Sequence, residues 1–428
     1  MASDSASIDS LCTLVVDCPH STPKWTDSGF VVLRNQNIKS GRLDTSSPSY
    51  TDAKHFADRI RRAKPSIGDI VITREAPMGE VCMVPAGLEC CLGQRQVLLR
   101  PDPKRIDPRF MFYALQSPPV QHQIGWSEGT GSTVSNLRIP VLKALSIPTP
   151  SRDMQEHAAD LLGALDDRIE LLRETNATLE AIAKLLFKSW FVDFDPVRAK
   201  AEGRDPEGLD AATAALFPSA FEASELGLIP KGWRAGRLGE LCQNIRSQAK
   251  PDALDSSTPY VGLEHMPRGS IALTAAGTAD GLASGKFWYA RNDVLFGKLR
   301  PYFHKVGVAS HTGVCSTDIL VIRANDQSWF GYTTMQLSSA AIIAYATRLS
   351  NGAKMPRSSW SDISSYKIVI PPKSLAGVFD ALVRGFVDRI HSNIETMSSL
   401  ASLRDTLLPR LISGKLRLPE AAIEDALT

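Results

Sequence analysis

The sequence predicts a mixed α/β protein in which two similar domains are related by a pseudo-twofold axis and separated by two long antiparallel coiled-coil helices. Three observations lead to this fold class. The chain repeats itself at long range, two segments keep a heptad spacing of apolar residues, and each copy contains short β-branched runs set between Gly and Pro residues. The 428 residues suffice for two domains with cores of their own, since a domain commonly has ~100–200 residues.

The internal repeat places one half of the chain over the other with offsets that fall steadily. LGELC at 238–242 aligns with IDSLC at 8–12, an offset of 230 residues. DRIHSNIET at 388–396 aligns with DRIELLRET at 167–175, an offset of 221. Intermediate matches give 228 and 224, as small deletions in the second half would produce, whereas chance matches would scatter. The chain therefore carries two copies of one plan, a mixed domain followed by a long helix.

Each mixed domain is predicted to contain several short strands and an intervening helical segment. The strand-like runs are rich in β-branched residues and are bounded by Gly or Pro, while the helical segments keep apolar residues three and four apart. The expected strands are IVIT (70–73), QVLLR (96–100), KALSIPTP (143–150), VLFGK (294–298), DILVIR (318–323) and YKIVIPP (366–372), and the expected helices are PRFMFYALQS (108–117) and GYTTMQLSSAAIIAYA (331–346).

Two further segments predict long helices that pair with each other. Apolar residues recur every three or four positions over 162–190 and again over 383–411, which is typical of a coiled coil. Asn176 falls at an a position and Asn393 at a d position, so an antiparallel pairing would bring them into one buried layer. The alternative is that each Asn lies on a solvated edge. In the paired register the other layers are Leu172 with Met397, Leu179 with Ile390, Ala183 with Phe386 and Leu186 with Val383.

The repeat and the composition together divide the chain into six consecutive parts. The boundaries are expected to be uncertain by a few residues, as is usual for predictions from sequence. The parts are a first mixed domain (1–151), a central long helix (152–195), an acidic connector (196–230), a second mixed domain (231–373), a C-terminal long helix (374–414) and a tail (415–428).

Composition excludes several classes of protein. Hydrophobic residues make up 43% and charged residues 22%, a soluble globular balance. No apolar run approaches the ~18 residues of a membrane span, and the first ten residues lack the basic and apolar regions of a secretion signal. The seven cysteines are odd in number and show no C-x-x-C spacing, which argues against a disulfide framework and a structural zinc site. We therefore expect a cytoplasmic protein without a membrane partner.

The net charge of +2 hides a strong division along the chain. Residues 231–373 carry 17 Lys and Arg against 9 Asp and Glu, and residues 1–150 carry 17 against 14. Residues 151–230, by contrast, carry 8 against 16. Positive charge confined to particular domains indicates a polyanion ligand such as nucleic acid. Ordinary surface variation is the alternative.

Four motifs carry a resemblance to a known family. LLFKSWFVDFDPVRAK (185–200) is the most distinctive, and LGLIPKGW (226–233), DCPHSTPKW (17–25) and GTGSTVSNL (129–137) accompany it. With these motifs the chain resembles the specificity (S) subunits of type I restriction-modification systems over nearly its whole length. SLAGVF (374–379) departs from the family, which usually has a Gln near the start of this helix, as at Gln155 in the first copy. That departure concerns the start of the C-terminal helix.

The resemblance implies a DNA-recognition and scaffold subunit with no catalytic residue of its own. Each mixed domain would be a target recognition domain that reads one half of a bipartite, asymmetric sequence in double-stranded DNA, with the paired helices setting the gap. Two modification (methyltransferase) subunits would bring S-adenosylmethionine. Restriction (translocase and nuclease) subunits would hydrolyse ATP with Mg, and this chain would bind no cofactor or metal. Trp190 and Phe191 are predicted to anchor a partner subunit, the alternative being that they belong to a core at the helix end.

DNA contacts are expected from Lys and Arg at phosphates and from Arg, Asn and Gln at base edges. Arg74 and Lys298 hold equivalent repeat positions at the ends of strands, and the Gly-rich turns at 129–133 and 351–354 offer amides to a phosphate. For any single candidate, the alternative is a solvated surface charge. The candidates in the first domain are Lys24, Arg34, Asn35, Gln36, Lys39, Arg74 and Arg95, and those in the second are Arg268, Lys298, Arg300, His304, Lys305, Lys354 and Arg357.

Two other functions stay open at this point. The first is a catalytic DNA methyltransferase or nuclease subunit with degenerate motifs, although the chain lacks the N/D-P-P-Y/F motif and a glycine fingerprint after a strand. GLASGKF (281–287) is one residue short of a phosphate-binding loop and lacks its Ser or Thr, and His304, His311 and Cys315 lack a fourth metal ligand. The second is a scaffold that does not read DNA.

Overall fold

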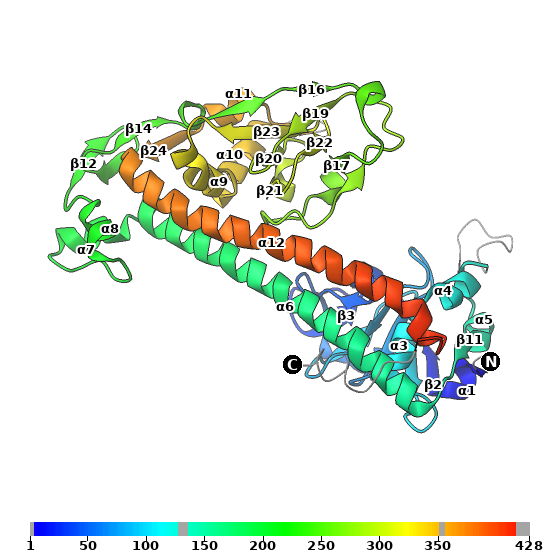
Figure 1. Ribbon diagram of the computed structural model, residues 1–428. Coiled ribbons are helices and arrows are strands. Elements are labelled where there is room, and N and C mark those ends of the chain that lie inside the picture. The colour runs from blue at the N-terminus through cyan, green and yellow to red at the C-terminus, as the bar shows by residue number, and fades with distance from the viewer. Residues whose placement is uncertain (1–3, 127–135, 351–355, 417–428) are drawn as a thin grey trace. The chain divides into compact units, whose positions relative to one another are not determined.

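The computed structural model describes residues 4–126, 136–350 and 356–416, and the chain divides into two compact units. Unit 1 consists of Met1–Ile169 and Ser399–Thr428, and unit 2 of Glu170–Ser398. Each unit contains one mixed domain together with a part of each of the two long helices, α6 (Arg152–Phe191) and α12 (Lys373–Ile412) (Figure 1). We describe the units one after the other.

Unit 1 is built around a four-stranded antiparallel sheet with the order β2-β10-β7-β8. A second sheet, β6-β3-β9, contains one parallel pair, and β1 pairs with β11 in a separate two-stranded sheet. The strands are β1 (Ser5–Ser7), β2 (Cys12–Asp17), β3 (Phe30–Leu33), β4 (Ile38–Lys39), β5 (Arg42–Leu43), β6 (Ser49–Thr51), β7 (Ile70–Thr73), β8 (Val81–Met83), β9 (Cys90–Leu92), β10 (Gln96–Pro101) and β11 (Ser146–Pro148). The helices are α1 (Ile8–Leu11), α2 (Ala53–Arg59), α3 (Pro108–Gln116), α4 (Pro118–Gly125) and α5 (Ile139–Ala144).

Unit 2 repeats this plan. Its four-stranded antiparallel sheet has the order β15-β23-β20-β21, its second sheet also contains one parallel pair, β17 with β22, and β14 pairs with β24 as β1 pairs with β11. The strands are β14 (Arg234–Arg237), β15 (Cys242–Ile245), β16 (Gln248–Ala249), β17 (Pro259–Val261), β18 (Gly277–Thr278), β19 (Lys286–Tyr289), β20 (Val294–Gly297), β21 (Val306–Val308), β22 (Gly313–Cys315), β23 (Ile319–Ala324) and β24 (Lys367–Ile370). The helices are α9 (Phe330–Leu337), α10 (Ala340–Ser350) and α11 (Trp360–Ser364).

One ion pair recurs at the same place in both domains. Asp69, just before β7, accepts hydrogen bonds from Arg100 on the neighbouring strand at 2.8 and 2.7 Å. Asp293, just before β20, accepts them from Arg323 at 2.7 and 2.8 Å. Both carboxylates are almost completely buried, so a charged partner is needed to offset their desolvation. The shared topology and this shared pair confirm the duplicated mixed α/β fold.

The first helix after each main sheet is fastened to a long helix by a polar side chain. In unit 1, Asp107 caps α3, and its own amide donates to Gln155 Oε1 of α6 at 2.9 Å. In unit 2, the amide of Gly331 in α9 donates to Asp380 Oδ1 of α12 at 2.8 Å. Asp380 thus provides the acceptor in the copy that lacks the usual Gln, and α12 begins at Lys373 without it.

The long helices α6 and α12 run antiparallel within each unit (Figure 1). In unit 2, Asn393 Nδ2 donates to Asn176 Oδ1 at 2.7 Å, which confirms the predicted register. Both Asn side chains are buried, so the hydrogen bond offsets the cost of taking two amides out of water. In unit 1, Asp166 and Arg404 form an ion pair at 2.7 Å in the same register. The predicted layer residues Leu179, Ala183, Leu186, Val383, Phe386 and Ile390 all belong to one apolar cluster.

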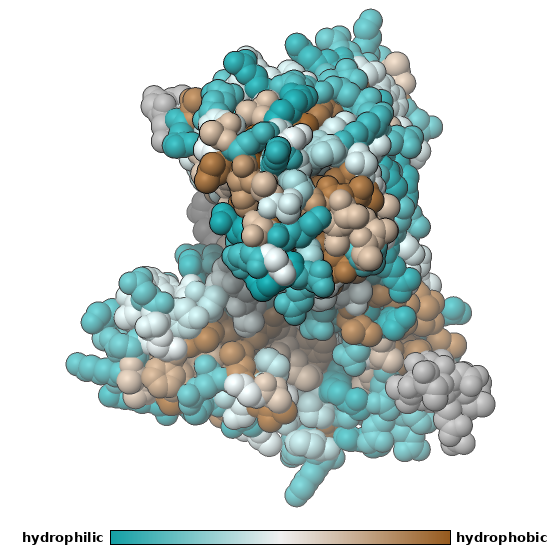
Figure 2. Space-filling model, turned by 90° about the vertical axis from the view of Figure 1, so that its left-hand side faces the viewer, coloured by the Kyte–Doolittle hydropathy of each residue, from teal (hydrophilic) through white to brown (hydrophobic). Residues whose placement is uncertain are grey.

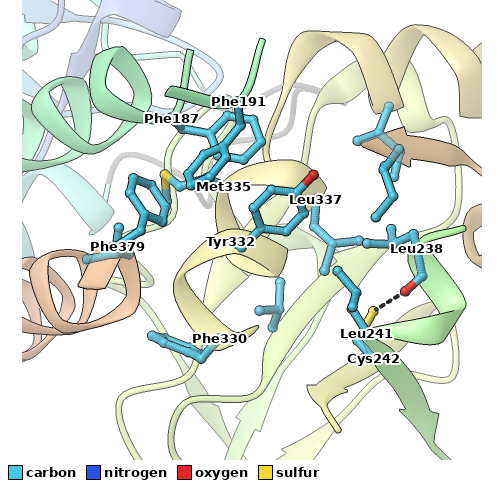
Figure 3. Packing of buried hydrophobic residues seen from close by; sticks show 14 of the residues in the cluster. Phe187, Phe191, Leu238, Leu241, Cys242, Phe330, Tyr332, Met335, Leu337 and Phe379 are labelled. Carbon is cyan, nitrogen blue, oxygen red and sulfur yellow. Dashed lines mark hydrogen bonds between the residues drawn. The ribbon is translucent and has the colours of Figure 1, made fainter. Parts of the chain in front are cut away.

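An aromatic core joins α6, α12 and the mixed domain in unit 2. Phe187 and Phe191 from α6 lie against Phe379 from α12 and Tyr332 from α9, with ring centroids 4.9–6.1 Å apart (Figure 3). Burying rings of this size contributes on the order of 2–3 kcal/mol each. The core therefore fixes the mixed domain to this part of the helix pair.

The predicted acidic connector is folded. It contains α7 (Asp195–Ala201), α8 (Ala211–Ala215) and a hairpin of β12 (Phe221–Ser224) and β13 (Gly227–Pro230). Phe217 is buried here and packs edge-on against Trp190, with ring centroids 5.3 Å apart. Figure 2 looks onto the side of unit 2 where α7, α8 and β12 lie, and its apolar groups form separate patches among hydrophilic side chains.

Candidate nucleic-acid interface

A hollow of about 350 Å³ in the first domain gathers four of the predicted DNA-binding residues. It lies between the residues that follow β3 and the residues that directly precede β10. The guanidinium of Arg34 lies 5.1 Å from the centre of the Trp25 ring, and that ring is 46% exposed. The hollow is lined by Pro23, Trp25, Arg34, Asn35, Gln36, Ala76, Gln94 and Arg95.

Hydrogen bonds hold part of this hollow in place. Asn35 Nδ2 donates to the carbonyl of Glu75 at 2.5 Å, while the Glu75 carboxylate lies 3.2 Å from Arg95. Asn35 Oδ1 is buried and has no hydrogen-bond partner among the described residues. Ala76 and Arg95 both have a positive φ, of 45° and 66°, a strained backbone conformation that is common at binding sites. The exposed guanidinium and amide groups are of the kinds that read base edges in DNA.

Lys24 and Lys39 lie outside this hollow. Lys24 Nζ is 3.5 Å from Asp52, and the lysine side chain is 64% exposed. Asp52 caps α2, and its pKa is lowered to about 2, first by the hydrogen bond from the His55 amide and then by the His55 side chain. Lys39 lies exposed on β4. Both cations are placed on the surface, where they can contact a phosphate.

Arg74, another predicted residue, has its guanidinium hydrogen-bonded within the domain. Its Nη1 donates to both carboxylate oxygens of Asp17 at 2.9 and 2.8 Å, and its Nε donates to the carbonyl of Leu137 at 3.0 Å. A further bond runs from Nη2 to Asn136 Oδ1 at 3.2 Å, and the side chain is only 13% exposed. A guanidinium whose donors are satisfied within the domain is a structural group, so Arg74 does not fit the role of a DNA contact.

A second hollow, of about 340 Å³, lies in the second domain. It contains the predicted Lys298 and Arg357 and also Arg246, which the sequence reasoning missed. Burial lowers the pKa of Lys298, Asp318 raises it, and the neighbouring Arg357 and Arg246 lower it further. Arg357 forms an ion pair with Asp318 at 2.8 Å. The lining residues are Asn244, Arg246, Phe287, Lys298, Ile319, Leu320, Arg357, Ser358, Ser359 and Trp360.

The remaining candidates of the second domain cluster around one short turn, Pro301–Phe303. His304 Nε2 lies 2.9 Å from the carbonyl of Ser338, and Lys305 Nζ donates to the carbonyl of Leu263, so both side chains hold the local fold. Arg268 lies over the Phe303 ring at 4.2 Å, and Arg300 is exposed. Lys354 and the Gly-rich turns at 129–133 and 351–354 lie outside the described residues.

Trp190 and Phe191, predicted to anchor a partner subunit, lie where the alternative placed them, in a core at the end of the helix. Trp190 is 2% exposed and Phe191 is 4% exposed, and both belong to the aromatic core of unit 2. A partner subunit cannot reach rings that are already covered by Phe217, Trp233 and Phe379. The bulky run at the end of α6 therefore stabilises this chain itself, because its apolar face is met by the connector and by α12.

The described residues contain no group of three or more His, Cys, Asp or Glu side chains that could hold a metal ion. All seven cysteines are free. Burial raises the pKa of the Cys82, Cys242 and Cys315 thiols to about 12, so these thiols stay protonated and unreactive. Within the same residues, no helix has the length and apolar character needed to cross a membrane.

Comparisons with known proteins agree on one family. Residues 18–181 match the family model described as the type I restriction modification DNA specificity domain. The MjaIX specificity subunit of Methanocaldococcus jannaschii is 26% identical over 371 residues, covering 82% of this chain and 78% of that protein. The HindI specificity subunit of Haemophilus influenzae is 25% identical, covering 89% of this chain and 94% of that protein. The crystal structure of a type I S subunit from M. genitalium has a similar fold, with a TM-score of 0.53, 17% identity and 95% of each chain covered.

Proposed function

This chain belongs to the family of type I restriction-modification DNA specificity subunits, and from that premise we propose that its two mixed domains each read one half of a bipartite, asymmetric DNA site. The first domain would use the hollow around Arg34, and the second would use the hollow around Lys298. The helix pair of α6 and α12 would set the gap between the half-sites.

The observation that carries this proposal is the combination of one topology with two different sets of side chains. Identical domains would read two identical half-sites, whereas these domains present different groups from matching sheets. The first hollow offers Trp25, Arg34 and Gln36, and the second offers Arg246, Lys298 and Trp360. Amide and guanidinium groups prefer different base edges, so different residues favour different half-site sequences.

A stripe on α6 is the surface that we assign to a modification subunit. Leu171, Ile182 and Leu185 are 51%, 40% and 66% exposed and recur with the spacing of a second helical seam, beside the residues that face α12. A helix of a partner would cover such a stripe and continue the existing helix pairing. This surface takes the place of Trp190 and Phe191 in the account of partner binding.

Ile182→Ser with Leu185→Ser tests this surface. The double variant is expected to lose co-purification with the modification subunit while keeping its thermal unfolding temperature, because both side chains are exposed. Leu228→Ser is the matched control, since Leu228 is 69% exposed on β13. Equal recovery of the partner by all three proteins would contradict the assignment.

Catalysis is assigned to the partners in this proposal. Two modification subunits would supply S-adenosylmethionine, and restriction subunits would supply ATP hydrolysis with Mg in the cytoplasm. The membership of the chain in a specificity-subunit family supports this division of labour, because sequence recognition and catalysis then reside on separate chains. The alternative is a catalytic methyltransferase or nuclease subunit.

The purified chain, incubated with duplex DNA and S-adenosylmethionine, separates these functions. We expect salt-sensitive binding of DNA without transfer of a methyl group, and methyl transfer only after the modification subunits are added. Methyl transfer by the chain alone would support the catalytic alternative. A chain that binds no DNA, alone or in the complex, would support a scaffold that does not read DNA.

A further inference from the structure

We infer that Arg246, Lys298 and Arg357 form a binding site for a DNA backbone phosphate in the second domain and that the first domain has replaced this site by an internal ion pair. The inference rests on the proposed DNA-reading function. It assigns a chemical class of ligand, a phosphate group, to the hollow of the second domain. It also explains why equivalent positions in the two domains behave differently.

The three cations line one hollow although they come from different parts of the chain. Arg246 follows β15, Lys298 follows β20, and Arg357 pairs with Leu299 as an isolated bridge. All three line the same hollow. Arg246 and Arg357 are exposed, while Lys298 is half-buried at its floor. A group that enters the hollow would therefore meet three positively charged side chains.

The local charge is unbalanced. Asp318 is the acid that lies beside Arg357 and Lys298, so three cations share one carboxylate. Neither Lys298 Nζ nor the Arg246 guanidinium has a side-chain hydrogen bond within the described ranges, so both have donors to offer. Like charges in a partly buried site repel one another, and a phosphate would relieve that repulsion while accepting hydrogen bonds from the donors. The pKa of Lys298 is lowered mainly by burial, and Arg357 and Arg246 contribute to the lowering while Asp318 opposes it.

Main-chain hydrogen bonds show which residues of the first domain are equivalent. The carbonyl of Arg74 accepts from the amide of Leu137 at 3.0 Å, and the carbonyl of Lys298 accepts from the amide of Ser358 at 2.9 Å. Arg74 thus corresponds to Lys298. The residues just before Leu137 and Ser358 are Asn136 and Arg357, so these two correspond as well.

The sheet register identifies the third position. The main-chain carbonyl of Arg95 accepts a hydrogen bond from the amide of Arg74, and the main-chain carbonyl of Asp318 accepts one from the amide of Lys298. Asp17 lies opposite the residue two positions after Arg95. In the second domain Ile245, the last residue of β15, lies opposite Val321, which is three positions after Asp318. The next residue, Arg246, is therefore level with the residue two positions after Asp318. Asp17 and Arg246 therefore occupy the same place in the two sheets.

The three positions have opposite character in the two domains. In the first domain, Asp17 and Asn136 accept hydrogen bonds from the Arg74 guanidinium. These internal bonds occupy the donors of Arg74 that a phosphate would otherwise use. In the second, the acid and the amide are replaced by Arg246 and Arg357, which leaves three cations and no internal acceptor among them. A structural ion pair in one copy has become a positively charged site in the other.

Arg246→Gln with Lys298→Gln tests the site in the full chain. The probe is a fluorescein-labelled duplex of random sequence, titrated over a range of salt concentrations. Because each phosphate that the protein neutralises contributes about 0.9 to the slope of log Kd against log salt, and this site takes one phosphate, the variant is expected to lose roughly 1 from that slope, with a similar loss of affinity for every sequence tested. Lys231→Gln with Lys250→Gln removes two exposed cations elsewhere in unit 2 and is expected to leave most of the slope in place.

A second variant guards against a folding defect. Arg246→Glu changes an exposed side chain, so its circular dichroism and thermal unfolding are expected to match wild type while its slope falls. If wild type binds DNA and both variants keep the wild-type slope, the phosphate site is wrong and the DNA-reading function stands. Loss of binding for one sequence alone would assign these residues to base reading instead. Wild-type protein without salt-sensitive DNA binding would overturn both the site and the function.

Discussion

Arg74 and Lys298 end equivalent strands, yet the charge opposite each of them decides its role. Asp17 faces Arg74 and holds it in a bidentate ion pair, whereas Arg246 stands at the matching place beside Lys298. The first arrangement contributes stability, and the second leaves a cation available to a ligand. The charge at this one position is negative in the first domain, at Asp17, and positive in the second, at Arg246. This difference separates the structural role of Arg74 from the binding role of Lys298.

Arg74→Met is expected to destabilise unit 1 by about 3 kcal/mol, because it leaves the largely buried Asp17 without its partner. Chemical denaturation followed by circular dichroism measures this change. Arg61→Met is the control, since Arg61 also forms an ion pair, with Asp58 at 2.6 Å, but is 78% exposed. The control should cost less than about 1 kcal/mol. Equal losses in the two variants would show that Arg74 is not a structural group.

His391 predicts a loss of stability at acid pH. Its ring is 1% exposed, and neither ring nitrogen has a hydrogen-bond partner among the described residues. Burial lowers its pKa to about 4, and Arg291 lowers the pKa further, although the neighbouring Val308 backbone, Asp388 and Glu395 raise it. The unfolded chain therefore binds a proton between pH ~6.5 and ~4 that the folded chain does not, so the free energy of unfolding falls as pH is lowered through this range.

Across this pH range the lowered pKa of His391 is expected to reduce the free energy of unfolding by on the order of 3 kcal/mol. Comparing the unfolding free energy of wild type and His391→Leu at pH 7.5, 6, 5 and 4 isolates it from the titration of carboxylates. Wild type should lose more stability than the variant between pH 6.5 and 4. Parallel curves for the two proteins would contradict the buried, neutral state of His391.

The sequence could predict residue types at the site more easily than residue roles. Arg34, Asn35 and Gln36 adjoin one another in the chain, so a local motif places them together. Arg246 was missed because its neighbours come from other strands of the sheet, and the ion pair of Arg74 was not foreseen because Asp17 lies 57 residues away in the chain. Which charges meet across a sheet depends on strand register, and a single sequence does not give that register.

At the scale of elements, the helix pair is the part that the sequence predicted in most detail. A heptad pattern identifies the faces that pair, and one polar layer in an apolar seam selects a register, because any other register would bury an Asn against a hydrocarbon. Asn176 and Asn393 meet as that argument requires. The short strands were less predictable, since pairs such as β3 with β9 join residues that are far apart in the chain.

Asn393→Leu is expected to cost about 1–3 kcal/mol, because it leaves the buried Asn176 Oδ1 without a donor. Asn176→Leu combined with Asn393→Leu should recover most or all of that loss, since an apolar layer needs no hydrogen bond. A double-mutant cycle of thermal or chemical unfolding measures the coupling between the two residues. Additive losses, without a coupling energy, would indicate that the layer does not stabilise this register.

The connector shows how a charged segment can be held in a fixed conformation. The segment carries the predicted excess of Asp and Glu, and it forms two helices and a hairpin whose apolar residues belong to the core of unit 2. Phe217 within the connector and Phe194 and Trp233 at its two ends supply the apolar contacts, and each is less than 10% exposed. A few aromatic residues can fix a charged segment, because each ring buries a large apolar area while the charges stay in water.

At the scale of the whole molecule, duplication followed by divergence accounts for both the fold and the proposed function. Two domains of one topology share their sheet order and their buried Asp–Arg pair, which maintain the fold. They differ in charged and aromatic residues that line their hollows, such as Arg34 in the first domain and Lys298 in the second. A protein with this organisation is suited to read two unlike DNA sequences.

The most direct test of this account is the recognition motif of the assembled complex, mapped from the methylated sites in a host genome. Wild type is predicted to give two unlike sequence blocks separated by a fixed gap. Arg34→Ala with Gln36→Ala, in the hollow of the first domain, is predicted to change the preferred bases of one block while the other block and the gap stay as they are. A palindromic or continuous motif, or a variant that alters both blocks together, would contradict the account.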